Sequence, residues 1–197
     1  MGEIKGKTIR HNSKLKDNDT IDIPEELIHK NKHLELSIDT MYVDILLFFT
    51  SISHELYYRT AQYLPSKHKK YYIQLIKEII SIHKFGEFNI KRIHCDQVFI
   101  NILQDFANDN NIQLICAPSQ AHVPRSDRNI RTMKERVRSL FHNLPYCGLP
   151  KIIMKCLVIQ TIATLNYFLA RYGLLQYYGP RIIMQQRLIT TTLENMC

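Results

Sequence analysis

The chain has 197 residues, of which 45% are hydrophobic and 22% charged, and this composition is that of an ordinary globular protein and excludes a disordered one. Its 26 lysines and arginines exceed its 18 aspartates and glutamates, which gives a formal net charge of +8. The excess is localised, because residues 117–151 hold seven cations and two anions whereas residues 34–116 hold eight cations and nine anions. Localised positive charge suits a phosphate backbone, and a solvated helix face accounts for it equally well.

The sequence carries no sign of a disulfide framework, a zinc site or a membrane span. Its five cysteines include no C-x-x-C pair, so we expect reduced thiols in an intracellular protein. His29 and His33 are spaced as H-x-x-x-H, but no cysteine pair accompanies them at zinc-site spacing. No apolar run reaches the ~20 residues that a membrane span needs, since Lys155 interrupts the run Ile152–Leu169. We therefore expect no membrane association.

The first 33 residues are predicted to be a polar arm or linker. Residues 1–22 have few apolar side chains and cannot bury enough surface to offset the entropy of ordering. Three strand-like runs follow, at Leu34–Tyr42, Ile45–Ile52 and Leu56–Leu64. The first alternates apolar and polar residues, the second is almost continuously apolar, and short polar breaks separate the three. This pattern predicts an antiparallel meander.

Helices alternate with strands in the second half. The apolar residues of Ser66–Phe85 recur at three- and four-residue steps before Gly86, which predicts a helix that ends at the glycine. The remaining elements are a strand at Ile90–Cys95, a helix at Val98–Asn108, a strand at Ile112–Cys116, a basic helix that ends near Leu144 and an apolar helix at Lys151–Arg171. The order β-β-β-α-β-α-β-α-α predicts an α/β fold with a mixed sheet of five strands flanked by helices.

Two aspartates stand near the carboxyl ends of predicted strands, Asp39 on the first and Asp96 after the fourth. A helical crossover delivers the fourth strand parallel to an earlier one. If it lies beside the first strand, the two aspartates become neighbours where open α/β sheets bind their ligands. Converging carboxylates would bind hard divalent cations, and two such ions can hold the attacking and leaving oxygens of a phosphoryl transfer. Alternatively, each aspartate is a strand-end or turn residue.

The stretch after Cys116 passes through a proline-containing turn and becomes a basic amphipathic helix. Its apolar face carries Ile130, Met133, Val137, Leu140 and Phe141. Its basic face carries Arg128, Arg131, Lys134 and Arg138. Each of these cations can neutralise a phosphate of a nucleic acid. The alternative is that two of the arginines pair with acidic residues three or four positions away on the same helix.

Asp127, in the first turn of this helix, has two interpretations. It is either a helix-start carboxylate favoured by the macrodipole or the third member of a metal site with Asp39 and Asp96. Glu135 is the rival for the third position, but it lies more than two turns further on and about 80° round the helix. We therefore assign the third position to Asp127.

These residues also carry a resemblance. The motifs L-S-I-D-T-M-Y-V around Asp39, I-H-C-D-Q-V-F around Asp96 and A-H-V-P-R-S-D-R-N-I-R-T-M-K-E-R-V-R around Asp127 resemble the integrase catalytic core of copia-like LTR-retrotransposon polyproteins. The match runs over residues 34–184, with a tail at 185–197. The resemblance implies a ribonuclease-H-like sheet with three antiparallel and two parallel strands. It also implies a two-metal polynucleotidyl transferase that holds Mg²⁺ or Mn²⁺ at the three aspartates.

In that family an activated water cleaves the DNA end, and the freed 3′-hydroxyl then attacks the target DNA. The expected partners are therefore the element's DNA ends, the target DNA and further copies of the chain, with the nucleus as the expected location. The family has Glu where Asp127 stands, and Asp is one methylene shorter. A second hypothesis is therefore a non-catalytic, nucleic-acid-binding or dimerising remnant of such an element.

Overall fold

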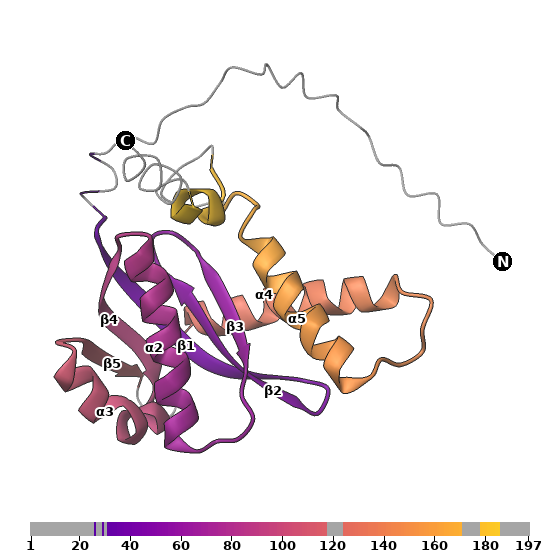
Figure 1. Cartoon of the computed structure of the whole chain (residues 1–197), viewed down its shortest axis with the longest axis horizontal. Coiled ribbons are helices and arrows are strands. Elements are labelled where there is room, and N and C mark those ends of the chain that lie inside the picture. Colours follow the sequence, from indigo (N-terminus) through magenta and orange to yellow (C-terminus); the bar gives the residue numbers. More distant parts are fainter. Residues whose placement is uncertain (1–25, 27–28, 30, 118–123, 171–177, 186–197) are drawn as a thin grey trace, which may run out of the picture.

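The computed structural model describes residues 26, 29, 31–117, 124–170 and 178–185. Five strands form one mixed sheet in the order β3-β2-β1-β4-β5 (Figure 1). They are β1 (His33–Val43), β2 (Leu46–Ser53), β3 (Arg59–Tyr63), β4 (Asn89–Asp96) and β5 (Gln113–Ala117). β1, β2 and β3 pair antiparallel, whereas β4 pairs parallel with β1 and β5 pairs parallel with β4. This confirms the predicted fold class and the predicted place of the fourth strand.

Helices lie on both faces of the sheet (Figure 1). They are α2 (Lys69–Phe85), α3 (Ile100–Asp109), α4 (Pro124–His142) and α5 (Lys151–Leu165), with a short 3-10 turn, η1 (Gln97–Phe99), before α3. Gly86 follows α2 as predicted; its amide donates to the Ile82 carbonyl, and the amide of the next residue, Glu87, donates to the Lys84 carbonyl. α5 ends earlier than the predicted Arg171, because Asn166 is its C-cap.

The core under α2 and α3 consists of apolar side chains that repeat at helical spacing on α2 and alternate on the strands. On α2 the buried residues are Tyr72, Leu75, Ile76, Ile79, Ile80 and His83. All of these except His83 pack in one cluster with Leu36 and Ile38 of β1 and Phe49 of β2. Phe49 meets Tyr72 edge-on, with ring centroids 5.7 Å apart. Because side chains alternate along a strand, the neighbours of Leu36 and Ile38 point to the other face of the sheet.

That other face is covered by α4 and α5. Met41, Phe48 and Ala61 of the sheet pack there with the buried side chains of the two helices. The helical members of this cluster are Met133 and Val137 from α4 and Val158 and Ile162 from α5. The protein is therefore three layers thick, with the basic helix placed against β1 and β2.

One strand begins later than predicted. The expected strand Leu56–Leu64 becomes β3 only at Arg59, because residues 54–56 form a turn and Tyr57 has φ of 57°. A positive φ is strained for a bulky residue and cannot continue a strand. His54 and Glu55 thus lie in a tight turn that connects β2 to β3.

The cysteines in the described part of the chain are free thiols. Cys95 and Cys116 face each other on β4 and β5 with their Sγ atoms 3.3 Å apart. Within the described residues, no helix combines the length and apolarity that crossing a bilayer requires. Most of the predicted arm at 1–33 and of the predicted tail at 185–197 lies outside the described residues.

Candidate functional site

The face of the sheet under α4 carries a row of polar side chains across β1 and β4. Residues paired on adjacent parallel strands point to the same side, and every second residue along a strand shares that side. The paired positions Glu35 with Arg92 and Ser37 with His94 therefore define one face. Met41 lies on this face and packs with α4. The row contains Glu35, Ser37 and Asp39 from β1 and Arg92, His94 and Asp96 from β4.

Asp39 and Asp96 are brought to this face as the sequence predicted. The parallel register ends at Ser37 with His94, and the two aspartates are each two residues further along their strands. Both are partly exposed. Asp39 lies four residues before the end of β1, because β1 continues into its hairpin with β2, and its Oδ1 accepts a hydrogen bond from Thr40 N at 2.6 Å. Asp96 ends β4 opposite Ala117.

Asp127 lies in the first turn of α4, as predicted, with an exposed side chain. The residues of α4 that face the sheet are Ser126, Asn129, Met133 and Val137. Among the described residues, the three aspartates do not form a group whose carboxylate oxygens all lie within 4.8 Å of one another. The structure thus joins Asp39 and Asp96 on one face, while the role of Asp127 as their third partner stays a prediction.

The predicted phosphate-binding residues lie along α4. Arg128, Arg131 and Arg138 are exposed. Lys134 and Arg138 line a cavity of about 190 Å³ beside the β1–β2 turn. In the part of the chain that the structure describes, no ion pair joins either acidic residue of α4 to an arginine of the same helix. The alternative of pairing within the helix therefore finds no support, and the role in DNA binding stays a prediction.

Arg125, which the sequence analysis did not single out, anchors the start of α4. Its Nη1 donates to the His54 carbonyl at 2.8 Å, and its guanidinium lies 5.2 Å from the centre of the Tyr57 ring. Further along α4, Asn129 Oδ1 accepts from Arg59 Nε at 3.0 Å. Arg125 thus ties the helix to the connection between β2 and β3, and Asn129 ties it to the first residue of β3.

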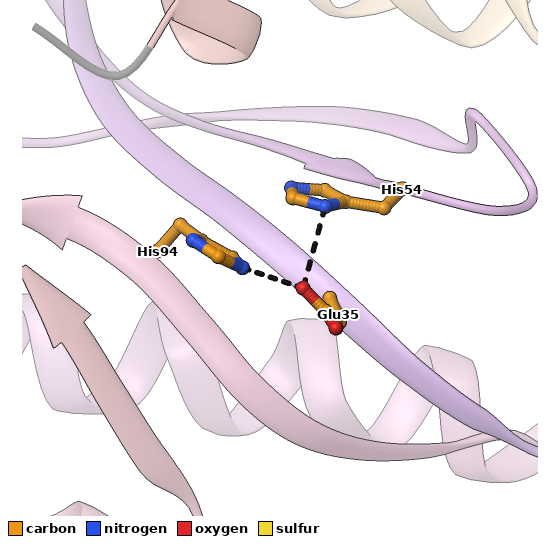
Figure 2. Close-up of side chains that lie close together, drawn as sticks. All are labelled: Glu35, His54 and His94. Carbon is orange, nitrogen blue, oxygen red and sulfur yellow. Dashed lines mark hydrogen bonds and ion pairs between the residues drawn. The ribbon is translucent and has the colours of Figure 1, made fainter.

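The residues that the structure brings closest together on this face are Glu35, His54 and His94, which the sequence analysis did not join. Figure 2 shows both imidazoles directed at the same carboxylate oxygen of Glu35. His94 Nε2 lies 2.6 Å and His54 Nδ1 3.6 Å from Glu35 Oε2. The two rings are stacked, with centroids 4.6 Å apart and planes 21° apart. Among the described residues, this is the group of three whose ligand atoms lie within 4.8 Å of one another.

A local irregularity in β4 helps to position Glu35. The pairing shifts between Leu34 and Glu35, so that Arg92 and not Lys91 stands opposite Glu35. Arg92 Nη2 then reaches Glu35 Oε1 at 3.1 Å. Such bulges re-aim side chains and are frequent beside active sites. No pattern in the sequence predicts this bulge.

Glu35 and His54 differ in their charge at neutral pH. The hydrogen bond from His94 lowers the pKa of Glu35, burial opposes this effect, and the charge of Arg92 reinforces it. Burial lowers the pKa of His54 to about 4, and the charges of Arg125 and His94 act in the same direction. The cluster therefore combines an ionised carboxylate with a neutral imidazole at His54. These are the protonation states in which both groups can act as ligands or proton acceptors.

The arrangement of the strands and helices is similar to that of a solved integrase domain. The catalytic core domain of BIV integrase superposes with a TM-score of 0.53 at 11% sequence identity, covering 80% of this chain and 97% of that domain. No family model and no curated protein matches the sequence. At this identity the likeness concerns the fold. The chain thus has the ribonuclease-H-like, mixed five-stranded fold of an integrase catalytic core.

Proposed function

We propose that the chain is an integrase-type polynucleotidyl transferase core that binds DNA ends and joins them to target DNA. The observation that carries the proposal is the parallel pairing of β1 and β4, which places Asp39 and Asp96 on one face of a ribonuclease-H-like sheet. Within this class we favour a core of the copia-like LTR-retrotransposon kind, on the sequence motifs around Asp39, Asp96 and Asp127. Such a core would act in the nucleus and as a multimer.

The donor atoms at the aspartates suit a hard cation. Asp39 and Asp96 offer partly exposed carboxylate oxygens, the ligand type that Mg²⁺ and Mn²⁺ prefer. Ions bound at these two residues and Asp127 would neutralise charge on the phosphoryl group during transfer. We assign the three carboxylates the task of holding the ions, with Asp127 contributed from α4.

The chain's own cations supply the rest of the DNA contact. Arg128, Arg131 and Arg138 are exposed on α4, the helix that also carries Asp127. A phosphate backbone lying along α4 would pass from these cations toward the aspartate face. The localised charge of residues 117–151 gives this binding its electrostatic strength.

End processing by the purified full-length chain tests the proposal. With Mn²⁺ and a duplex that mimics the element's end, we expect nicking near the 3′ terminus, and Asp96→Asn is expected to abolish it. Asp109→Asn is the matched control, because Asp109 is an exposed aspartate at the end of α3. The wild-type chain could instead bind this DNA without nicking it, and the Asp96→Asn variant could bind it equally well. That result would identify the chain as the non-catalytic remnant.

A further inference from the structure

We propose that Glu35, His54 and His94 form a binding site for Zn²⁺, separate from the aspartates. The three residues come from three segments: Glu35 from β1, His54 from the connection after β2, and His94 from β4. All their ligand atoms lie within 4.8 Å of one another, and both histidines are directed at one oxygen of Glu35 (Figure 2). The site goes beyond the proposed function, which does not use these residues.

The donor set selects the kind of metal. Two imidazole nitrogens and one carboxylate oxygen are the ligands of zinc sites that keep a fourth position for water. Mg²⁺ and Ca²⁺ take oxygen ligands almost throughout and would leave both histidines unused. The cluster therefore favours a borderline transition-metal ion over the hard cation that suits Asp39 and Asp96.

The spacing of the donors is close to what zinc requires. Bonds of about 2.0–2.2 Å at tetrahedral angles place ligand atoms roughly 3.3 Å apart. His54 Nδ1 and Glu35 Oε2 are 3.6 Å apart, which is near this value. His94 Nε2 lies 2.6 Å from the same oxygen, so this ring needs to withdraw by about 0.7 Å. The ion then takes the place of the proton that the hydrogen bond now holds.

Further contacts keep the ligand atoms directed inward. His54 Nε2 lies 2.6 Å from Oγ of Ser37, a fully buried residue. With its Nε2 proton donated to Ser37, His54 presents the bare Nδ1 to the site. The second oxygen of Glu35 is held by Arg92 at 3.1 Å. Such outer contacts orient most metal-binding histidines and carboxylates in proteins.

The cluster is accessible to a metal ion from solvent, and it lies apart from Asp39 and Asp96. The side chains of Glu35, His54 and His94 are between 18% and 23% exposed. At a strand rise of about 3.3 Å per residue, Glu35 lies roughly 13 Å from Asp39 and His94 roughly 7 Å from Asp96. An ion held here would link β1, β4 and the β2–β3 connection on the face that carries the aspartates, without sharing a ligand with them.

The first test is direct metal binding by the purified, metal-stripped full-length chain. Titration with Co²⁺ is expected to give the visible absorption of a four-coordinate ion and to saturate at one equivalent, and Zn²⁺ is expected to displace it. Zn²⁺ should also raise the melting temperature by mass action. No saturable binding, or binding that a millimolar excess of Mg²⁺ removes, would overturn the proposal.

Variants locate the site. Glu35→Gln and His94→Gln are expected to weaken Zn²⁺ binding by more than about 100-fold, because a lost ligand costs more than the roughly 10–100-fold of a lost outer partner. Ser37→Ala, which removes only the outer contact to His54, should fall within that 10–100-fold range. His68→Gln, at an exposed histidine, is the matched control and should bind as the wild type does.

Two further variants separate this proposal from its competitors. Joint replacement of His29 and His33 by glutamine is expected to leave binding intact, and loss of binding there would move the site to that pair. Asp39→Asn with Asp96→Asn is also expected to leave Zn²⁺ binding intact, whatever it does to DNA. If a ligand variant fails to fold by circular dichroism, the wild-type titration and Ser37→Ala still decide the matter.

Discussion

Asn166 bonds the backbone of Arg59 twice across 107 residues of sequence. Its Oδ1 accepts from Arg59 N at 2.7 Å, and its Nδ2 donates to Arg59 O at 2.8 Å. Asn166 caps α5 and is only 1% exposed, while Arg59 begins β3. One buried amide therefore satisfies both polar groups at the start of a strand and fixes α5 against the sheet.

We predict that Asn166→Ala lowers the free energy of unfolding by about 2–4 kcal/mol, because it removes two hydrogen bonds and leaves buried backbone groups unpaired. Urea denaturation measures the change. Asn101→Ala, at an exposed residue of α3, is the control and should change stability by less than about 0.5 kcal/mol. A loss in Asn166→Ala no larger than in the control would mean that water replaces the amide at no cost.

The topology was predictable from sequence because it depends on local patterns and one general rule. The meander follows from short polar breaks between apolar runs, and the parallel fourth strand follows from a helical crossover. The position of β4 beside β1 then places Asp39 and Asp96 together without any knowledge of side-chain geometry. Each step uses the periodicity of the apolar residues or the order of strands and helices along the chain, and both can be read directly from the sequence.

The cluster of Glu35, His54 and His94 was not predictable in the same way. Its members are up to 59 residues apart. Their meeting depends on the pairing shift at Glu35 and on the turn in which Tyr57 has a positive φ. The alternation of β1 showed that Glu35 shares a face with Asp39, but polar residues alternating on a strand usually face solvent. No pattern in the sequence therefore links Glu35 to the two histidines.

His83 predicts a pH dependence of stability. It is buried in α2, with Nδ1 2.8 Å from the Ile79 carbonyl, and its ring meets Tyr58 edge-on with centroids 5.7 Å apart. Its Nε2 has no hydrogen-bond partner among the described residues. Burial lowers its pKa below 6.5, against the opposing effect of the Ile79 carbonyl. As the pH falls, His83 is therefore protonated at a higher pH in the unfolded chain than in the folded chain. The contribution of neutral His83 to the free energy of unfolding is present above pH 6.5 and is lost as the pH falls below this value.

We expect the free energy of unfolding to fall by up to about 2 kcal/mol through His83 between about pH 7 and pH 5. In His83→Leu this part of the decrease should disappear, whatever the stability of the variant at pH 7. Denaturant titrations at both pH values measure it. His68→Gln, at an exposed histidine, should retain the wild-type decrease. Equal decreases in wild type and His83→Leu would assign the acid sensitivity to other groups.

The exposed arginines of α4 predict how DNA binding depends on salt. If Arg131 and Arg138 each neutralise one phosphate, replacing both by alanine should reduce the slope of log K against log salt by about 1.8, or roughly 0.9 per contact. Fluorescence anisotropy with a labelled duplex at several salt concentrations measures the slope. Lys84→Ala with Lys91→Ala is the matched control, since it removes two exposed cations outside α4. An equal change in both pairs would show that binding follows net charge and not the face of α4.

Asp127→Glu tests whether side-chain length limits catalysis at the third position. The extra methylene extends the carboxylate by roughly 1.5 Å from α4. Since a misplacement of about 1 Å costs on the order of 100-fold in rate, the variant is expected to nick end-mimicking DNA about 10–100 times faster than wild type with Mn²⁺. Asp96→Asn in the same chain should abolish the gain, because it removes a ligand that the longer side chain cannot replace.

Asp109→Glu adds the same methylene at the end of α3 and should leave the nicking rate unchanged. The rival third carboxylate, Glu135, is exposed on α4. Glu135→Gln is therefore expected to keep the activity that Asp127→Glu gains. If Asp127→Glu changes nothing and Glu135→Gln removes nicking, the third ligand is Glu135, and the metal site lies about two turns further along α4 than the sequence motif indicates.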